Sequence, residues 1–308
     1  MFAGYSMSEL GSIMAMQGFA GLILFSVFVL MALGLAIIFG QMGVINMAHG
    51  EFMILGAYVT YLTSQAFTTY IPGFFAGYFF VAVVLAFVVS GALGMSVEWA
   101  LISRLYKRPL DTLLATWGLS LVLQQVYRSV FGAREVGVDQ PDWMMGATNL
   151  TDTIQIPING IIVMVLTTII TIGVFLLIYS TGWGKQVRAV VSNRMMASAV
   201  GIDTEKVDRV TFGIGCGIAG VAGSAFTMIG STSPTAGQLY IVDTFLIVVF
   251  GGAASLAGTI ASAFSISQAR SILEFFLSGS MAQVIVLLAV IMILMIRPQG
   301  LFALKVRR

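Results

Sequence analysis

Charged residues, histidine and cysteine are all scarce in this chain. Only 9% of its 308 residues are Asp, Glu, Lys or Arg, against about a quarter in a typical soluble domain. With 58% hydrophobic residues and a mean hydropathy of +0.99, almost nothing remains for a soluble domain. The composition therefore predicts an all-α, polytopic membrane helix bundle that forms a single domain over residues 1–308.

The few reactive residues exclude several kinds of site. One cysteine, Cys216, lies inside a hydrophobic segment, so no disulfide or cysteine-based metal site forms within the chain. The first basic residue is Arg104, so residues 19–39 lack the basic flank of a secretory signal and are expected to stay as a span. The formal net charge of +2 says little by itself.

The distribution of basic residues predicts the orientation of the chain. Twelve of the fifteen fall in three short segments, which the positive-inside rule places in the cytoplasm, together with the C-terminus. These residues are Arg104, Lys107 and Arg108; Lys185, Arg188, Arg194, Lys206 and Arg209; and Arg297, Lys305, Arg307 and Arg308.

Apolar runs between these anchors predict about nine crossings, with eight or ten as alternatives, and an external N-terminus. The segment at 239–254 is short and glycine-rich, so a broken or re-entrant element is expected there. The expected spans are 19–39, 46–64, 73–99, 110–131, 159–179, 210–230, 239–254, 256–277 and 281–296.

Two stretches interrupt the apolar pattern, GQMGVINMAHGEF at 40–52 and the glycine-containing segment at 231–258. Paired interruptions in two halves of a chain indicate a transporter site built from broken helices. Asn46, His49 and Glu51 are therefore candidates for the substrate pathway. His49 and Glu51 are too few ligands for a metal site. They are expected either to relay protons or, as the favoured interpretation, to brace the start of the next helix.

Further candidates are polar residues at helical spacing. Thr112, Thr116, Ser120 and Gln124 form one stripe that either lines a route for a small neutral solute or hydrogen-bonds to neighbouring helices. Asp243 has no evident local partner, whereas Arg270 and Glu274 are spaced as an i, i+4 ion pair. Small residues at four-residue spacing favour tight helix packing; these are Gly213, Gly217, Gly220 and Ser224.

The loop at 181–209 is expected to form a short amphipathic helix that ends at Gly201. Its apolar face needs a partner, either lipid headgroups or, as the favoured choice, another protein. No lysine completes a phosphate-binding P-loop, so any ATP would be bound by separate chains. The chain itself is expected to be no enzyme and to carry no cofactor, metal or nucleic acid.

Four motifs in order resemble the permeases of branched-chain amino acid ABC importers: GLAIIFGQMGVINMAHGEFMILGAY, RAVVSNRMMASAVGI, VVFGGAASLAG and RPQGLF. Within that family, INMAHGEFMILGAY, RPLDTLLATWGLSLVLQQ and RPQGLFALKVRR look most like the urea-importer subgroup of the UrtB type. The resemblance implies a homologous second permease, two cytoplasmic ATPase subunits and a periplasmic substrate-binding protein.

The resemblance also implies that residues 188–202 contact an ATPase. The positions carried over are Arg188, Ala189, Asn193, Arg194, Ala197 and Gly201. Asn193 stands where many relatives have an acidic residue, so no salt bridge is carried over there. A branched-chain amino acid or short-amide permease, and a passive channel or ion-coupled carrier, are the alternative functions. An intramembrane enzyme is disfavoured because no G-x-S-G or paired intramembrane aspartates occur.

Overall fold

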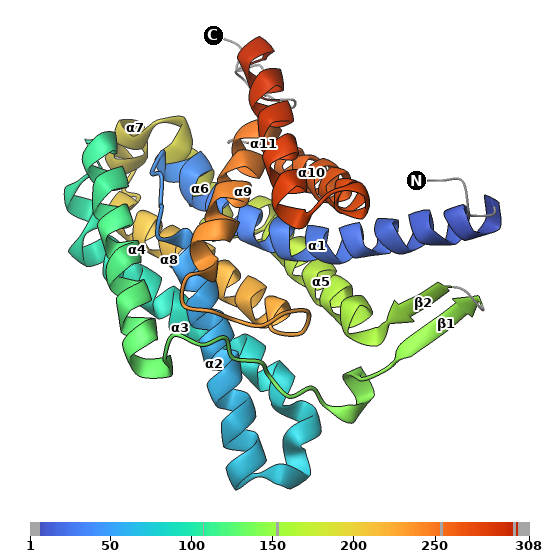
Figure 1. The fold of residues 1–308 in the computed structure, drawn as a ribbon. Coiled ribbons are helices and arrows are strands. Elements are labelled where there is room, and N and C mark those ends of the chain that lie inside the picture. Colours follow the sequence, from blue (N-terminus) through green and yellow to red (C-terminus); the bar gives the residue numbers. More distant parts are fainter. Residues whose placement is uncertain (1–6, 107, 152–153, 253–254, 298–299, 301–308) are drawn as a thin grey trace.

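The computed structural model describes residues 7–106, 108–151, 154–252, 255–297 and 300. Lys107, Lys305, Arg307 and Arg308, and parts of the VVFGGAASLAG and RPQGLF motifs, lie outside these residues. Figure 1 shows a bundle of helices that cross at varied angles. Its α-helices are α1 (Met7–Met42), α2 (His49–Tyr70), α3 (Tyr78–Ala100), α4 (Pro109–Phe131), α5 (Ile158–Ser180), α6 (Gly182–Ser192), α7 (Arg194–Ala199), α8 (Thr204–Phe226), α9 (Ala236–Gly251), α10 (Leu256–Phe276) and α11 (Gly279–Ile296).

Each of the nine predicted spans overlaps one of these helices, which confirms a multi-pass membrane bundle. Among the residues that the structure describes, five segments are long and apolar enough to cross a membrane, namely those of α1, α3, α5, α8 and α11. Helix α9 has only 16 residues, or about 24 Å of helix, which is short of a hydrocarbon core about 30 Å thick. The number nine is therefore approximate, and α9 fits the broken element expected there.

Helix α8 lies at the centre and packs against α1, α2 and α3. Glycines make these contacts. A Cβ atom added to Gly56 of α2 would overlap the backbone of Gly220, and one added to Gly223 would overlap the backbone of Met53. Small side chains let helix backbones approach closely in lipid, so the tight packing predicted from the glycine spacing is confirmed.

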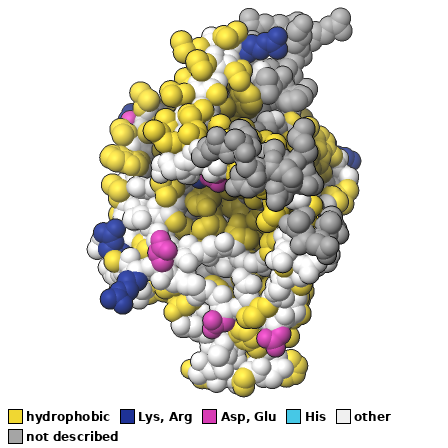
Figure 2. Space-filling view, turned by 45° about the vertical axis from the view of Figure 1, so that its right-hand side comes forward, with side chains coloured by type: hydrophobic (Ala, Val, Ile, Leu, Met, Phe, Trp, Pro, Cys, Tyr) yellow, Lys and Arg dark blue, Asp and Glu magenta, His cyan; other side chains and the backbone are white. Residues whose placement is uncertain are grey.

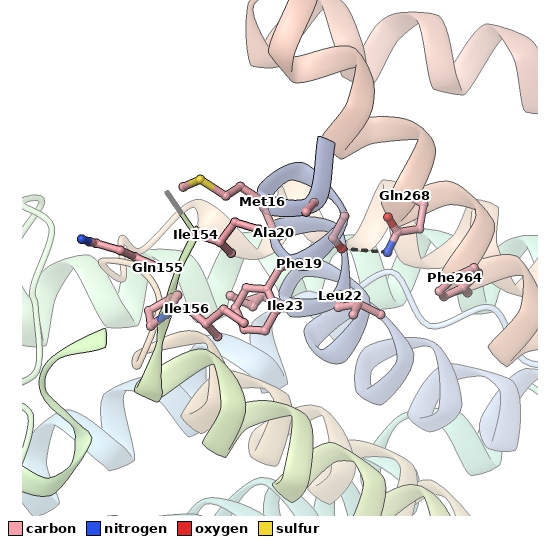
Figure 3. A pocket seen from close by; sticks show the side chains of 13 residues that line it. Met16, Phe19, Ala20, Leu22, Ile23, Ile154, Gln155, Ile156, Phe264 and Gln268 are labelled. Carbon is pink, nitrogen blue, oxygen red and sulfur yellow. Dashed lines mark hydrogen bonds between the residues drawn. The ribbon is translucent and has the colours of Figure 1, made fainter. Parts of the chain in front are cut away.

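A short antiparallel hairpin, β1 (Ala147–Thr151) and β2 (Ile154–Pro157), joins α4 to α5 and was not expected from the sequence. The first half of α1, β2 and α10 line a largely apolar cavity of about 580 Å³ (Figure 3). Its one drawn hydrogen bond runs from Gln268 Nε2 to the carbonyl oxygen of Gly18, at 3.2 Å. On the face seen in Figure 2, hydrophobic side chains far outnumber charged ones, as expected for a bundle surrounded by lipid.

Candidate functional site

The first interruption begins where α1 ends. Gly43 has a φ of +64°, a left-handed conformation that glycine adopts without strain, and the chain is non-helical up to Ala48. Buried Asn46 shapes this turn, because its Oδ1 accepts a hydrogen bond from the Ala48 N–H at 3.1 Å. Helix α2 therefore starts at His49, three residues later than the sequence pattern indicated.

His49 is fully buried against α1. Its Nε2 lies 3.1 Å from the carbonyl oxygen of Met31, and the imidazole also borders Gly34. This contact ties the start of α2 to the middle of α1. Within the described residues, no three His, Cys, Asp or Glu side chains gather as metal ligands would.

Glu51 points instead to α4. Its Oε1 accepts hydrogen bonds from Gln124 Nε2 at 2.8 Å and from Ser120 Oγ at 3.0 Å, while Tyr127 donates to its backbone carbonyl at 2.9 Å. The carboxylate is 1% exposed. Because His49 and Glu51 bond to different helices, this geometry favours bracing over a relay that uses both side chains.

The predicted polar stripe divides between two partners. Thr116 Oγ1 accepts from the Met47 N–H at 3.1 Å, so Thr116, Ser120 and Gln124 attach α4 to the interruption between α1 and α2. Thr112 instead donates to the carbonyl oxygens of Leu105 and Arg108 at the start of its own helix. The structure thus favours the interhelical hydrogen-bond interpretation over the lining of an open route.

The two interruptions meet at a pair of glycines that sequence analysis did not connect. A Cβ atom on Gly50 would overlap the backbone of Gly237, and one on Gly237 would lie 3.1 Å from Glu51 Oε1. Both α2 and α9 begin here, so the positive ends of two helix dipoles converge beside the Glu51 carboxylate. The signal in the sequence was a glycine within each interruption.

Asp243, for which the sequence offered no local partner, has a distant one. Its Oδ2 lies 2.7 Å from Arg270 Nη1 and 3.2 Å from Gln283 Nε2. The expected pair of Arg270 and Glu274 is also present at 2.9 Å. Arg270 thus bridges two carboxylates, and the partnership escaped sequence analysis because 27 residues separate it from Asp243.

The loop predicted to hold one amphipathic helix holds two. Asn193 interrupts it with an extended backbone, and its side chain accepts from the Met196 N–H at 3.0 Å as the N-cap of α7. Gly201, with a φ of +87°, follows the end of α7, where the Ile202 N–H donates to Ala197 at 3.1 Å. The helix boundary predicted at Gly201 is confirmed, and the single helix was wrong because Asn193 caps a second one.

The apolar face predicted for docking is mostly used inside the chain. Val187, Val190, Ala197 and Val207 pack together, with Ala189 beside them. Arg188 donates to the carbonyl of Ile178 and lies over the Tyr179 ring. The large apolar side chains left exposed in this segment are Val191, Met195, Met196 and Val200. We call these four residues the α6–α7 apolar surface.

Comparisons with known proteins place this chain in a family. Residues 18–296 match the family model for the permease component of branched-chain amino acid transport systems. The chain is 28% identical to the high-affinity branched-chain amino acid transport system permease protein LivH of Escherichia coli K12, over 96% of this chain and 97% of that protein.

Two other relatives are similar to this chain over nearly their whole length. The probable LivH of Methanocaldococcus jannaschii is 27% identical over 96% of this chain and 94% of its own. The permease BraD of Pseudomonas aeruginosa is 24% identical over 91% and 93%. No solved structure matches. The expectation of a transport subunit that is not an enzyme is confirmed by these relatives, and the chain belongs to the family of branched-chain amino acid transport system permease components.

Proposed function

We propose that this chain is one permease subunit of an ATP-driven importer in a bacterial inner membrane. It forms half of the translocation route with a homologous permease, and receives solute from a periplasmic binding protein. Two ATPase subunits bind at the end that carries α6 and α7, which faces the cytoplasm. The observation that carries the proposal is the α6–α7 apolar surface on a membrane permease without a P-loop: Met195 is 81% exposed and Val200 is 76% exposed.

The exposed methionines suit a protein partner. An apolar surface surrounded by polar residues marks an interaction site, and flexible methionine side chains adapt to a partner surface. Arg188, Asn193 and Arg194 instead bond within the chain. Arg188 and Asn193 therefore shape the surface and Arg194 attaches α7 to α8, while Met195, Met196 and Val200 contact the ATPase.

Docking is tested by copurification of the ATPase subunits with the permease. Met195→Gln should reduce the retained ATPase about tenfold, as loss of one well-packed interface side chain does. Met145→Gln is the matched control, because Met145 is 53% exposed in the loop before the hairpin. Equal retention by both variants would contradict the assignment of this surface.

The substrate we propose is urea, with a branched-chain amino acid as the second candidate. Urea is supported by the resemblance of the INMAHGEFMILGAY and RPLDTLLATWGLSLVLQQ segments to urea-importer permeases. The second candidate is supported by the relatives LivH and BraD, which are permeases of branched-chain amino acid transport systems. Both solutes are small, and both would exchange water for protein hydrogen bonds on the way.

Uptake into vesicles that contain the whole transporter and its binding protein tests this function. We expect radiolabelled urea to accumulate only with ATP on the ATPase side, and leucine to accumulate less. Accumulation of leucine alone would assign the second substrate. Uptake that continues unchanged without ATP would contradict the proposal and favour a passive channel or an ion-coupled carrier.

A further inference from the structure

A chain of polar contacts connects the short helix α7 to the central helices. Arg194 Nη2 lies 2.6 Å from Asp208 Oδ2 of α8, and its guanidinium lies over the ring of Tyr106 at 5.3 Å. The Tyr106 hydroxyl donates to Glu98 Oε1 of α3 at 2.6 Å. Arg209 of α8 donates to the other oxygen of Glu98 at 3.3 Å. We call these five residues the α7 network.

Burial makes the α7 network hard to open. The carboxylate side chains of Glu98 and Asp208 are 1% and 4% exposed, whereas their arginine partners are about half-exposed. A carboxylate left buried without its partner is strongly destabilising. Burial raises the pKa of the Tyr106 hydroxyl, so it keeps its proton and donates to Glu98. Each carboxylate therefore holds its arginine in place.

The network joins the short helix α7 to the tightly packed pair of helices α3 and α8. Helix α7 has six residues and carries the exposed methionines, whereas α8 and α3 pack together through Gly91, Gly94 and Gly213. Glycine contacts between backbones leave no room for the two helices to deform separately. A displacement of α7 thus moves α8 and α3 as one body.

Helix α6 has a different attachment. Thr181 caps it through the Gly184 N–H at 3.0 Å, and Arg188 donates to the carbonyl of Ile178 at the end of α5. Helix α6 is therefore hydrogen-bonded to α5 and packs through apolar contacts against α1 and α8. In the part of the chain that the structure describes, α7 is the one of the two helices that forms an ion pair with α8.

We infer that the α7 network is the mechanical link that passes ATPase motion from α7 to α3 and α8. Its members are positioning residues, because none of them needs to touch ATP or solute. The inference rests on the proposed function and names the route by which the ATPase drives the bundle. Without the link, the ATPase still binds the α6–α7 apolar surface and hydrolyses ATP, but the bundle no longer follows.

The test measures solute transported per ATP hydrolysed in vesicles that contain the whole transporter. The double variant Arg194→Gln with Asp208→Asn removes the ion pair without leaving a buried charge unpaired. We expect this ratio to fall about tenfold, within the usual range of coupling between sites, while ATPase retention stays unchanged. Arg108→Gln is the matched control, because the Arg108 side chain is 76% exposed and pairs only with Asp111, at 3.5 Å.

A second variant covers the case in which the double variant fails to assemble. Tyr106→Phe deletes one hydroxyl and keeps the ring under Arg194, and we expect the ratio to fall about fivefold, the effect of one typical hydrogen bond. A ratio equal to that of the unmodified transporter in either assembled variant would overturn the inference. Absence of ATP-dependent uptake by the unmodified transporter would instead overturn the proposed function.

Discussion

Helices α4 and α8 have the same length of 23 residues but are held in the bundle in opposite ways. Seventeen residues of α8 are buried, and its contacts run through glycine and alanine. Only five residues of α4 are buried, and every one carries a hydroxyl or amide: Thr112, Thr116, Ser120, Gln124 and Tyr127. Close packing between backbones holds α8 in place, whereas hydrogen bonds hold α4 in place.

The difference follows from the solvent. In lipid, apolar side chains gain little by leaving the surroundings for a helix contact, so close packing and hydrogen bonds decide where a helix sits. Helix α4 leaves Leu110, Leu114 and Val130 exposed at 60% or more, and it is fixed by what it donates to the α1–α2 interruption. The interruption itself supplies the acceptor, Glu51. The interruption between α1 and α2 thus holds α4 in place through hydrogen bonds.

The largest expected effect comes from filling the contact that shapes α8. Gly56→Ala adds a methyl group that overlaps the backbone of Gly220, and we expect a loss of at least about 3 kcal/mol in the free energy of unfolding, the upper end for overpacked cores, because a backbone cannot turn aside as a side chain does. Thermal unfolding in detergent measures it. Gly118→Ala on α4 is the control, because nothing lies within 4 Å of the added atom. A gain of about 0.5–1 kcal/mol is expected there, and similar losses in both variants would break the comparison.

The junction of the two interruptions should be nearly as sensitive. Gly50→Ala overlaps the backbone of Gly237, so α2 and α9 must separate, and we expect most uptake to be lost. His49→Gln keeps a hydrogen-bond donor for the Met31 carbonyl and should retain most uptake. Vesicle uptake by the two variants at equal protein level makes the measurement. The reverse ranking would favour a proton relay through His49.

Removing the Glu51 carboxylate, which accepts hydrogen bonds from α4, should lower the free energy of unfolding by a smaller amount. Glu51→Ala removes the acceptor that Ser120 and Gln124 share, although Gln124 still donates to Ser120, and a buried donor left unsatisfied costs about 1–3 kcal/mol. Glu51→Gln keeps an oxygen and should cost less. Asp111→Asn is the matched control, because this exposed carboxylate at the start of α4 contributes at most about 1 kcal/mol. Unfolding experiments that show no difference between Glu51→Ala and Asp111→Asn would mean that apolar contacts hold α4.

The smallest effect concerns the cap of α7. Asn193→Ala removes the acceptor of the Met196 N–H and should destabilise this short helix by about 1 kcal/mol. Asn193→Asp keeps an acceptor and should leave α7 intact. Amide hydrogen exchange over residues 194–199 distinguishes them. Exchange at equal rates in both variants would show that packing alone maintains α7.

Much of the fold followed from the sequence, while much of the site did not. The nine apolar segments, the tight glycine packing and the end of the loop helix near Gly201 are local patterns with a local cause. The partnership of Asp243 with Arg270 and the hairpin at 147–157 were missed. Each depends on segments that meet only after folding, or on strands too short to give a clear alternation.

The sequence by itself determined that this chain is a multi-pass helix bundle of a permease family, because hydropathy, charge distribution and motif order are properties of the chain alone. Only the tertiary structure decided what the polar residues do. It turned Glu51 toward α4, His49 toward α1 and Asn193 into a cap. A buried polar group is fixed by the partner that satisfies its hydrogen bonds, and that partner comes from a distant part of the chain.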